Sequence, residues 1–111
     1  MSKTEIKLKE LVVGNDITPT TYRMACTDGD YPAGTIVEYD STTKKLKKAT
    51  AAANMFGIVA DDSKVTTTDN KIVVYVTGRF DFKECICPVV EGETILDYKI
   101  RGKETGIFFA E

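Results

Sequence analysis

Two cysteines at the end of a hydrophobic stretch are the side chains best suited to metal or redox chemistry. Cys85 and Cys87 directly precede Pro88, and Cys26 is the third cysteine of the chain. On an extended strand, such a pair points the same way with Cα atoms about 6.6–6.8 Å apart, near the upper limit for a disulfide. Zinc would need more ligands from a second cysteine pair or from histidines, and the chain has neither. We therefore predict two small side chains at a strand end, with no metal and no cofactor.

The chain contains no histidine, the residue that most often serves as general base and metal ligand. A Ser-His-Asp or Cys-His catalytic arrangement cannot be built, and neither a P-loop nor a GxGxxG phosphate-binding loop occurs. Carboxylates and lysines are present, but no motif places them for catalysis. The sequence therefore predicts a protein that is not an enzyme.

Four lysines lie close together in the segment KKLKK, residues 44–48. A patch that binds nucleic acid would interleave such charges with aromatic side chains, but the neighbours are Leu46, threonines and alanines. Lysines on a hairpin more often solvate an exposed strand edge and prevent wrong pairing. Because the net charge is −2, we favour the solvated edge and expect no direct nucleic-acid partner.

The composition is that of one folded domain. The chain has 111 residues, of which 42% are hydrophobic and 29% charged, values that argue against general disorder. No run approaches the roughly 18 apolar residues that span a bilayer, and the N-terminus MSKTEIKLKE lacks the apolar centre of a signal peptide. We expect a protein of a cytosol-like compartment with no membrane partner.

The elements that position these side chains are short strands with polar turns between them. Apolar alternation or short apolar runs predict strands in the ranges 6–13, 20–27, 35–40, 46–49, 55–60, 72–87 and 105–111. Segment 28–34 is dense in turn-forming residues, and segment 63–71 is polar, so a turn and a loop are expected there. From position 74 to 82 every second residue is apolar or glycine, which predicts one apolar face. Gly78 lies in that face and indicates a bulge or the close approach of another backbone. The same alternation puts Cys85 and Cys87 on the polar face with Lys83.

One segment favours a helix. Thr94 is placed to cap ILDYKIR, with Arg101 in the last turn and Gly102 just past the end. At about two turns, this helix depends on packing against the sheet. Many short strands and one short helix predict a mainly β domain, a small barrel or sandwich.

Three segments occur in a recognisable order: AGTIVEYDSTTKKLKKAT, then FGIVADD, then, after a loop of threonines, VVYVTGRFDFKECICP. Together they resemble the head decoration proteins of lambda-like phages. Those proteins share a strand ending in an aspartate before a Ser/Thr-rich turn, a GI(L/V)A segment, and a strand Tyr-x-x-Gly-x-Phe that closes on a proline. The matching residues of the last two motifs are Gly57, Ile58, Tyr75, Gly78, Phe80 and Pro88. The resemblance runs from Tyr31 to the C-terminus.

The resemblance implies a small single-domain, mainly β subunit of the β-barrel or β-clip-like (β-tulip) kind, with one short C-terminal helix, that forms a homotrimer. It implies a capsid decoration, or cement, protein. Such a trimer binds the major capsid protein at local threefold sites of the expanded head and stabilises the head against internal DNA pressure. It is located on the outer surface of the virion, and in the host cytoplasm before assembly. A capsid-associated adhesion or receptor-binding module, and an unrelated small β interaction domain, stay open as alternatives.

The chain is expected to divide into an N-terminal arm or strand, residues 1–15, that contacts the capsid, and a β-rich decoration domain, residues 16–111. The family's arm adds a strand to the capsid, and the alternation of TEIKLKE suits strand addition, in which main-chain hydrogen bonds supply affinity. The expected capsid-binding residues are Ile6, Leu8, Leu11, Val12 and Val13. Alternatively, the segment is an edge strand of its own domain.

Overall fold

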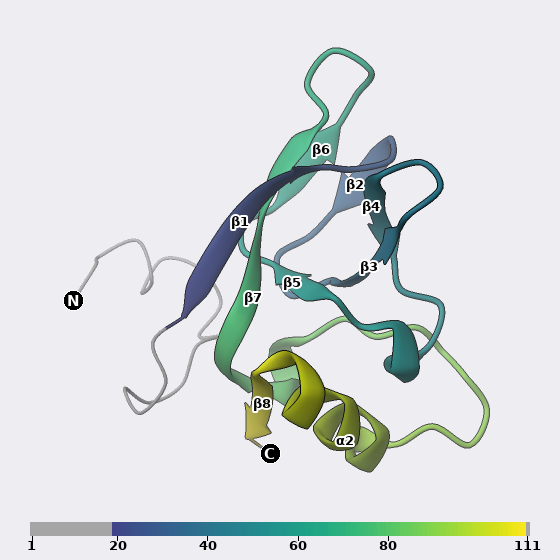
Figure 1. Cartoon of the computed structure of the whole chain (residues 1–111), viewed down its shortest axis with the longest axis vertical. Helices are drawn as coiled ribbons and strands as arrows, with labels where there is room; N and C mark the ends of the chain where they lie inside the picture. Colours follow the sequence, from purple (N-terminus) through teal and green to yellow (C-terminus); the bar gives the residue numbers. More distant parts are fainter. Residues whose placement is uncertain (1–18, 111) are drawn as a thin grey trace.

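A computed structural model describes residues 19–110 (Figure 1). With 46% strand and one α-helix among these residues, the protein is a small, mainly β domain, as predicted. The strands are β1 (Thr20–Ala25), β2 (Gly29–Tyr31), β3 (Ile36–Asp40), β4 (Lys45–Lys48), β5 (Gly57–Val59), β6 (Ser63–Val65), β7 (Lys71–Asp81) and β8 (Ile107–Ala110). The helical elements are the 3₁₀ turns η1 (Ala52–Asn54) and η2 (Phe82–Glu84) and the α-helix α2 (Ile95–Thr105).

The main sheet is organised around β7. Its strand order is β1-β7-β5-β3-β4, with antiparallel neighbours throughout, and β8 adds to β7 in parallel. In Figure 1, β1 and β7 lie side by side, and α2 lies next to β8. A further bridge joins Cys26, just after β1, to Leu46 of β4, and the Thr27 N–H donates to the Leu46 carbonyl at 2.9 Å. The two ends of this strand order therefore meet.

Strands β2 and β6 form a separate antiparallel pair in segments expected to be a turn and a loop. Each strand has three residues, and only Tyr31 of β2 and Val65 of β6 are buried in them. Three residues are too few for alternation to distinguish a strand from a turn. The prediction of a turn and a loop is therefore wrong for these residues, because their pairing comes from a distant segment.

The main sheet buries apolar side chains on both faces. The helix-side cluster consists of Ile36, Ala49, Ala52, Met55, Ile58, Phe80, Tyr98, Ile107 and Phe109. The hairpin-side cluster consists of Cys26, Tyr31, Val37, Leu46, Val59, Val65, Ile72 and Val74. The neighbours Ile58 and Val59 belong to different clusters, because successive side chains of a strand point to opposite faces.

Strand β7 changes face at a bulge. The register between β1 and β7 shifts between Thr20 and Thr21, which makes Val76 an extra residue of β7. Consequently Val74 packs in the hairpin-side cluster, whereas Phe80 packs in the helix-side cluster. The sequence predicted a bulge or a close backbone approach at Gly78, and the register shift lies two residues earlier, at Val76. The prediction of a single apolar face along this strand is wrong, because the extra residue inverts the alternation.

Gly78 lies just beyond this bulge. Its φ of 141° belongs to a backbone region that is open mainly to glycine. A Cβ at this position would lie 2.8 Å from Cζ of Phe80, and the Phe80 ring in turn packs 5.1 Å from the ring centroid of Tyr75. The tyrosine, glycine and phenylalanine of the motif Tyr-x-x-Gly-x-Phe therefore pack together, with Phe80 between Gly78 and Tyr75.

Helix α2 begins where predicted and ends later. The Thr94 hydroxyl accepts a hydrogen bond from the first turn, and the Asp97 carboxylate accepts one from the Thr94 N–H at 2.7 Å, which completes a capping box. Gly102 is inside the helix, and the residue that ends it is Gly106, with φ 86°. A Cβ on Gly102 would overlap the carbonyl oxygen of Ile107. The predicted helix end is therefore wrong: the packing of β8 on the helix, not the helix end, requires glycine at this position.

Candidate interaction surface

The cysteine pair does not lie on a polar face, contrary to the prediction. Strand β7 ends at Asp81, η2 interrupts the alternation, and Cys85 and Cys87 pack against the helix-side cluster. Burial raises the pKa of the Cys26 and Cys87 thiols above the ordinary value of 9.0. This disfavours the thiolate that metal binding and nucleophilic attack require. Within residues 19–110, no group of three or more cysteine, aspartate or glutamate side chains is arranged to hold a metal ion.

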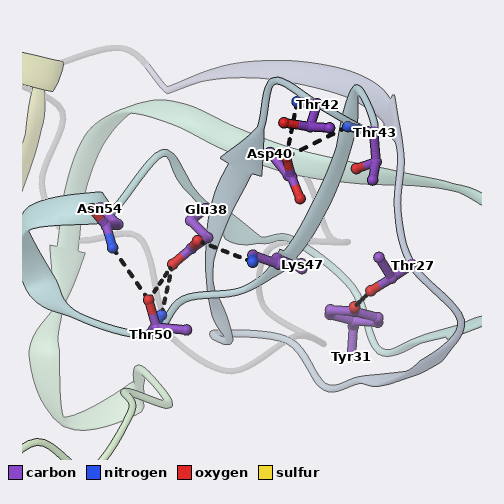
Figure 2. Close-up of polar contacts among 9 residues, drawn as sticks. All are labelled: Thr27, Tyr31, Glu38, Asp40, Thr42, Thr43, Lys47, Thr50 and Asn54. Carbon is purple, nitrogen blue, oxygen red and sulfur yellow. Dashed lines mark hydrogen bonds and ion pairs between the residues drawn. The ribbon is translucent and has the colours of Figure 1, made fainter.

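The lysine segment forms β4, the last strand in the order of the main sheet. Leu46 is buried there, while the flanking lysines stay partly or fully exposed. The Lys47 ammonium lies 3.6 Å from the Glu38 carboxylate (Figure 2), and the Lys48 ammonium lies 5.5 Å from the ring centroid of Tyr31. The lysine side chains are therefore partly or fully exposed, as predicted, and they contact Glu38 of β3 and Tyr31 of β2. The outer edge of β4 is not left wholly to solvent, however, because Leu46 is bridged there to Cys26.

Carboxylates fix both ends of the β3–β4 hairpin, as Figure 2 shows. Glu38 accepts hydrogen bonds from the N–H and hydroxyl of Thr50 at 2.7 and 2.8 Å, and Asp40 accepts from the Thr42 N–H at 2.9 Å. Partial burial raises the pKa of Glu38, but the Thr50 hydrogen bonds and Lys47 outweigh it, so this pKa lies below the ordinary 4.5. These contacts rigidify the hairpin and leave no carboxylate there with the raised pKa of a general acid.

The residues that carry the family resemblance lie together, except for Pro88. Ile58 of β5 pairs with Tyr75 of β7, and a Cβ on Gly57 would lie 2.8 Å from the Tyr75 carbonyl oxygen. Phe80 is fully buried against the Tyr75 ring. Pro88 lies beyond η2, where it lines two surface pockets. Apart from Pro88, these residues have packing roles.

The expected capsid-binding residues fall outside the described residues. They are Ile6, Leu8, Leu11, Val12 and Val13. The proposed boundary between an arm, 1–15, and a domain, 16–111, falls there too. Within the part of the chain that is described, no helix has the length and apolar character needed to cross a membrane.

Helix α2 carries an exposed apolar pair that the sequence analysis missed. Leu96 is 60% exposed and Ile100 is 57% exposed, and their spacing of four residues puts them on one side of the helix. The buried helix residues Tyr98 and Gly102 face the opposite way. The sequence contained a signal for this exposed pair: the helix has apolar residues on two opposite sides, and only one of these sides can pack on the sheet.

Charged side chains of opposite sign flank this apolar pair. At about 100° per residue, Lys99 and Lys103 fall on one side of the pair, and Asp97 and Glu104 fall on the other. We call the surface of Leu96, Ile100 and these four charged residues the α2 outer face. Glu104 is 69% exposed and lies 3.9 Å from Arg101 of its own helix. The face thus combines a small apolar stripe with a basic and an acidic margin.

A pocket of about 390 Å³ lies beside α2 and is lined partly by Pro88, Cys87 and Tyr98. Glu93 also lines it, and its carboxylate accepts a hydrogen bond from the Ala52 N–H at 2.9 Å. The second Glu93 oxygen and the Tyr98 hydroxyl are buried, with no hydrogen-bond partner of normal geometry among the described residues. Burial raises the pKa of Tyr98, and the nearby Cys87 and Glu93 add to this effect. Most of the residues that line the pocket are apolar, so the pocket presents a mainly apolar surface.

No protein-family model matches the chain, and comparison with curated proteins gives no match. The features on which a functional proposal can rest are those of the structure itself: a small, mainly β domain with exposed lysines on β4 and an exposed apolar face on α2.

Proposed function

We propose that the chain is a capsid decoration protein of the lambda-like phage type. It binds as a homotrimer to local threefold sites of the expanded head and stabilises the head against internal DNA pressure. The observation that carries this proposal is the packing of the motif residues on one another. Gly57 and Gly78 leave the space that Tyr75 and Phe80 occupy, so the spacing on which the resemblance rests has a physical cause.

The proposal includes a β-barrel or β-clip-like form of the subunit. A β-barrel or β-clip-like (β-tulip) subunit needs its outer strands to approach each other, because closure removes unpaired edges. The bridge from Cys26 to Leu46 supports this arrangement, since it joins the segment after β1 to β4, at the two ends of the strand order.

Such a protein acts by binding alone and needs no catalytic group or cofactor. The proposed partner is the major capsid protein, to which residues 1–15 add a strand through main-chain hydrogen bonds, with Ile6 and Leu8 on one side of that strand. Three arms on one trimer bind together, and avidity of this kind raises affinity by about 10²–10⁴ where geometry permits. Weak single contacts therefore suffice to hold a trimer on the outer surface of the virion.

The direct test adds purified full-length protein to expanded, undecorated heads of lambda-like phages and follows their thermal disruption by calorimetry. The expected result is saturable binding, with three chains at each threefold site, and disruption at a higher temperature than for bare heads. Heads that neither bind the protein nor gain heat resistance, across a panel of such phages, contradict the proposal.

A deletion of residues Met1–Asn15 tests the arm. The expected product is a folded trimer, by circular dichroism and light scattering, that no longer binds heads. A misfolded product instead supports the alternative in which this segment is an edge strand of its own domain. Light scattering of the full chain gives a separate check, because a monomer at micromolar concentration contradicts the trimer.

A further inference from the structure

We infer that the α2 outer face is the contact through which copies of this chain meet around the threefold axis. The partner is a second and third copy of the same chain, packed helix against helix. This inference rests on the trimer of the proposed function and adds to it the residues and the geometry of the subunit contact.

The apolar part of the argument is the exposure of two large side chains on one short helix. Leu96 and Ile100 are more than half exposed, whereas Tyr98 and Gly102 of the same helix already pack on the domain. Other exposed large apolar residues lie on separate strands or in the loop before the helix, as with Tyr22 of β1 and Val89. A helix with one side packed on its own domain and a second apolar side facing solvent is typical of a helix that packs on another protein chain.

The charged margins indicate how the copies are related. When parallel helices are related by an axis along their length, the basic margin of each helix meets the acidic margin of the next. An antiparallel pair around a perpendicular twofold axis instead places lysines opposite lysines and carboxylates opposite carboxylates. The opposite signs of the two margins of α2 are therefore complementary for parallel packing, as three helices around a threefold axis require.

One pair of residues is best placed to join neighbouring helices. Lys103 and Glu104 are consecutive, so they lie at nearly the same height on opposite margins, and both are exposed. Asp97 accepts a hydrogen bond from the Thr94 N–H, and Lys99 has a contact of its own. Glu104 pairs with Arg101 of its own helix only at 3.9 Å and stays 69% exposed, so its carboxylate is still accessible to a neighbouring chain. The arrangement thus predicts an ion pair between Lys103 of one copy and Glu104 of the next.

The first experiment removes the apolar stripe. The double variant Leu96→Gln/Ile100→Gln is compared with wild type by sedimentation equilibrium at micromolar concentration. Because both positions are exposed and glutamine is a good helix former, the fold is expected to remain, by circular dichroism, while the trimer dissociates to monomers. The matched control is Val89→Gln, which changes a fully exposed apolar residue (103%) outside the helix and is expected to leave the trimer intact.

The second experiment tests the parallel geometry by charge exchange. Lys103→Glu and Glu104→Lys each place like charges on facing margins, and each is expected to weaken the trimer roughly tenfold or more at low salt. The double variant with both substitutions restores opposite margins and is expected to be clearly more trimeric than either single variant. Full recovery is not expected, because Lys at position 104 repels Arg101 of the same helix.

The outcomes separate this inference from the function on which it rests. A Leu96→Gln/Ile100→Gln protein that stays trimeric shows that α2 is not the contact, and leaves the decoration trimer standing. A charge-exchange double variant that is no more trimeric than either single variant overturns the parallel geometry. A wild-type protein that is a monomer or dimer at every concentration overturns the proposed function together with this inference.

Discussion

Gly102→Ala is a substitution for which local propensity and tertiary packing predict opposite signs. Inside a helix, alanine is more favourable than glycine by about 1 kcal/mol, so the helix alone predicts a gain in stability. In the folded protein, however, Gly102 is buried, and a Cβ there would overlap the carbonyl oxygen of Ile107 and lie 3.1 Å from its carbonyl carbon. Ile107 is the first residue of β8 and pairs with Gly78 of β7, so its carbonyl cannot move without displacing a strand.

The expected magnitude follows from these two terms. Overpacking typically costs 1–3 kcal/mol, and we take about 3 kcal/mol because the obstacle is backbone and not a flexible side chain. After subtraction of about 1 kcal/mol of helix propensity, the free energy of unfolding is expected to fall by about 2 kcal/mol. For a domain of this size, that corresponds to a decrease in Tm of roughly 10 °C.

Urea unfolding followed by far-UV circular dichroism measures this change, at one fixed protein concentration because association makes stability concentration-dependent. The control is Gly92→Ala. No atom lies within 4 Å of the added Cβ there, and only the left-handed φ of 84° penalises alanine, by about 1 kcal/mol. A Gly102→Ala protein that is as stable as wild type, or more stable, refutes the reasoning, because the overlap with Ile107 would then not lower the free energy of unfolding.

Three further predictions concern caps, pH and thiols. Thr94→Ala removes the capping hydroxyl and is expected to lower the free energy of unfolding in urea by about 1 kcal/mol, whereas Thr94→Ser keeps most of it. Because the pKa of Glu38 is lowered below 4.5 in the folded protein, Glu38 stabilises the fold above that pH and loses this contribution as the pH falls through the lower folded pKa. Glu38→Gln is therefore expected to flatten the acid loss of stability in urea titrations, and an unchanged profile contradicts this. Because burial raises the pKa of Cys26 and Cys87, their alkylation at neutral pH is expected to be slower in the folded protein than in urea. Equal rates would show that neither thiol is protected.

Elements with local signals were predictable from the sequence. The hairpin of β3 and β4 follows from a strand that ends in Asp40 and a turn of serine and threonines, and the Asp40 carboxylate binds that turn directly. The start of α2 follows from Thr94 and Asp97, which cap each other within one turn of chain. In both cases the interacting groups are a few residues apart, so the pattern that predicts the element also contains the interaction that stabilises it.

Local sequence signals predicted only part of the candidate interaction surface. The exposure of the lysine side chains was predicted, because charge and turn signals lie within one short segment, but the bridge from Leu46 to the distant Cys26 was not. The α2 outer face was missed, because the sequence does not say which side of an amphipathic segment packs on the sheet. That choice depends on Tyr98, which packs with Phe82 and Phe109 from other elements, at ring centroid distances of 5.4 and 6.1 Å.

The sequence by itself thus determined a small, mainly β domain with a hairpin, a central apolar strand and one capped helix, because each depends on contacts between near neighbours. Tertiary structure decided the rest. The bulge in β7 depends on pairing with β1, and the β2–β6 pair on two segments far apart in the chain. The two glycines of the helix show the difference most clearly, since either could end it by local rules. Gly106 ends it, and Gly102 leaves room for a carbonyl of the strand that packs beside it.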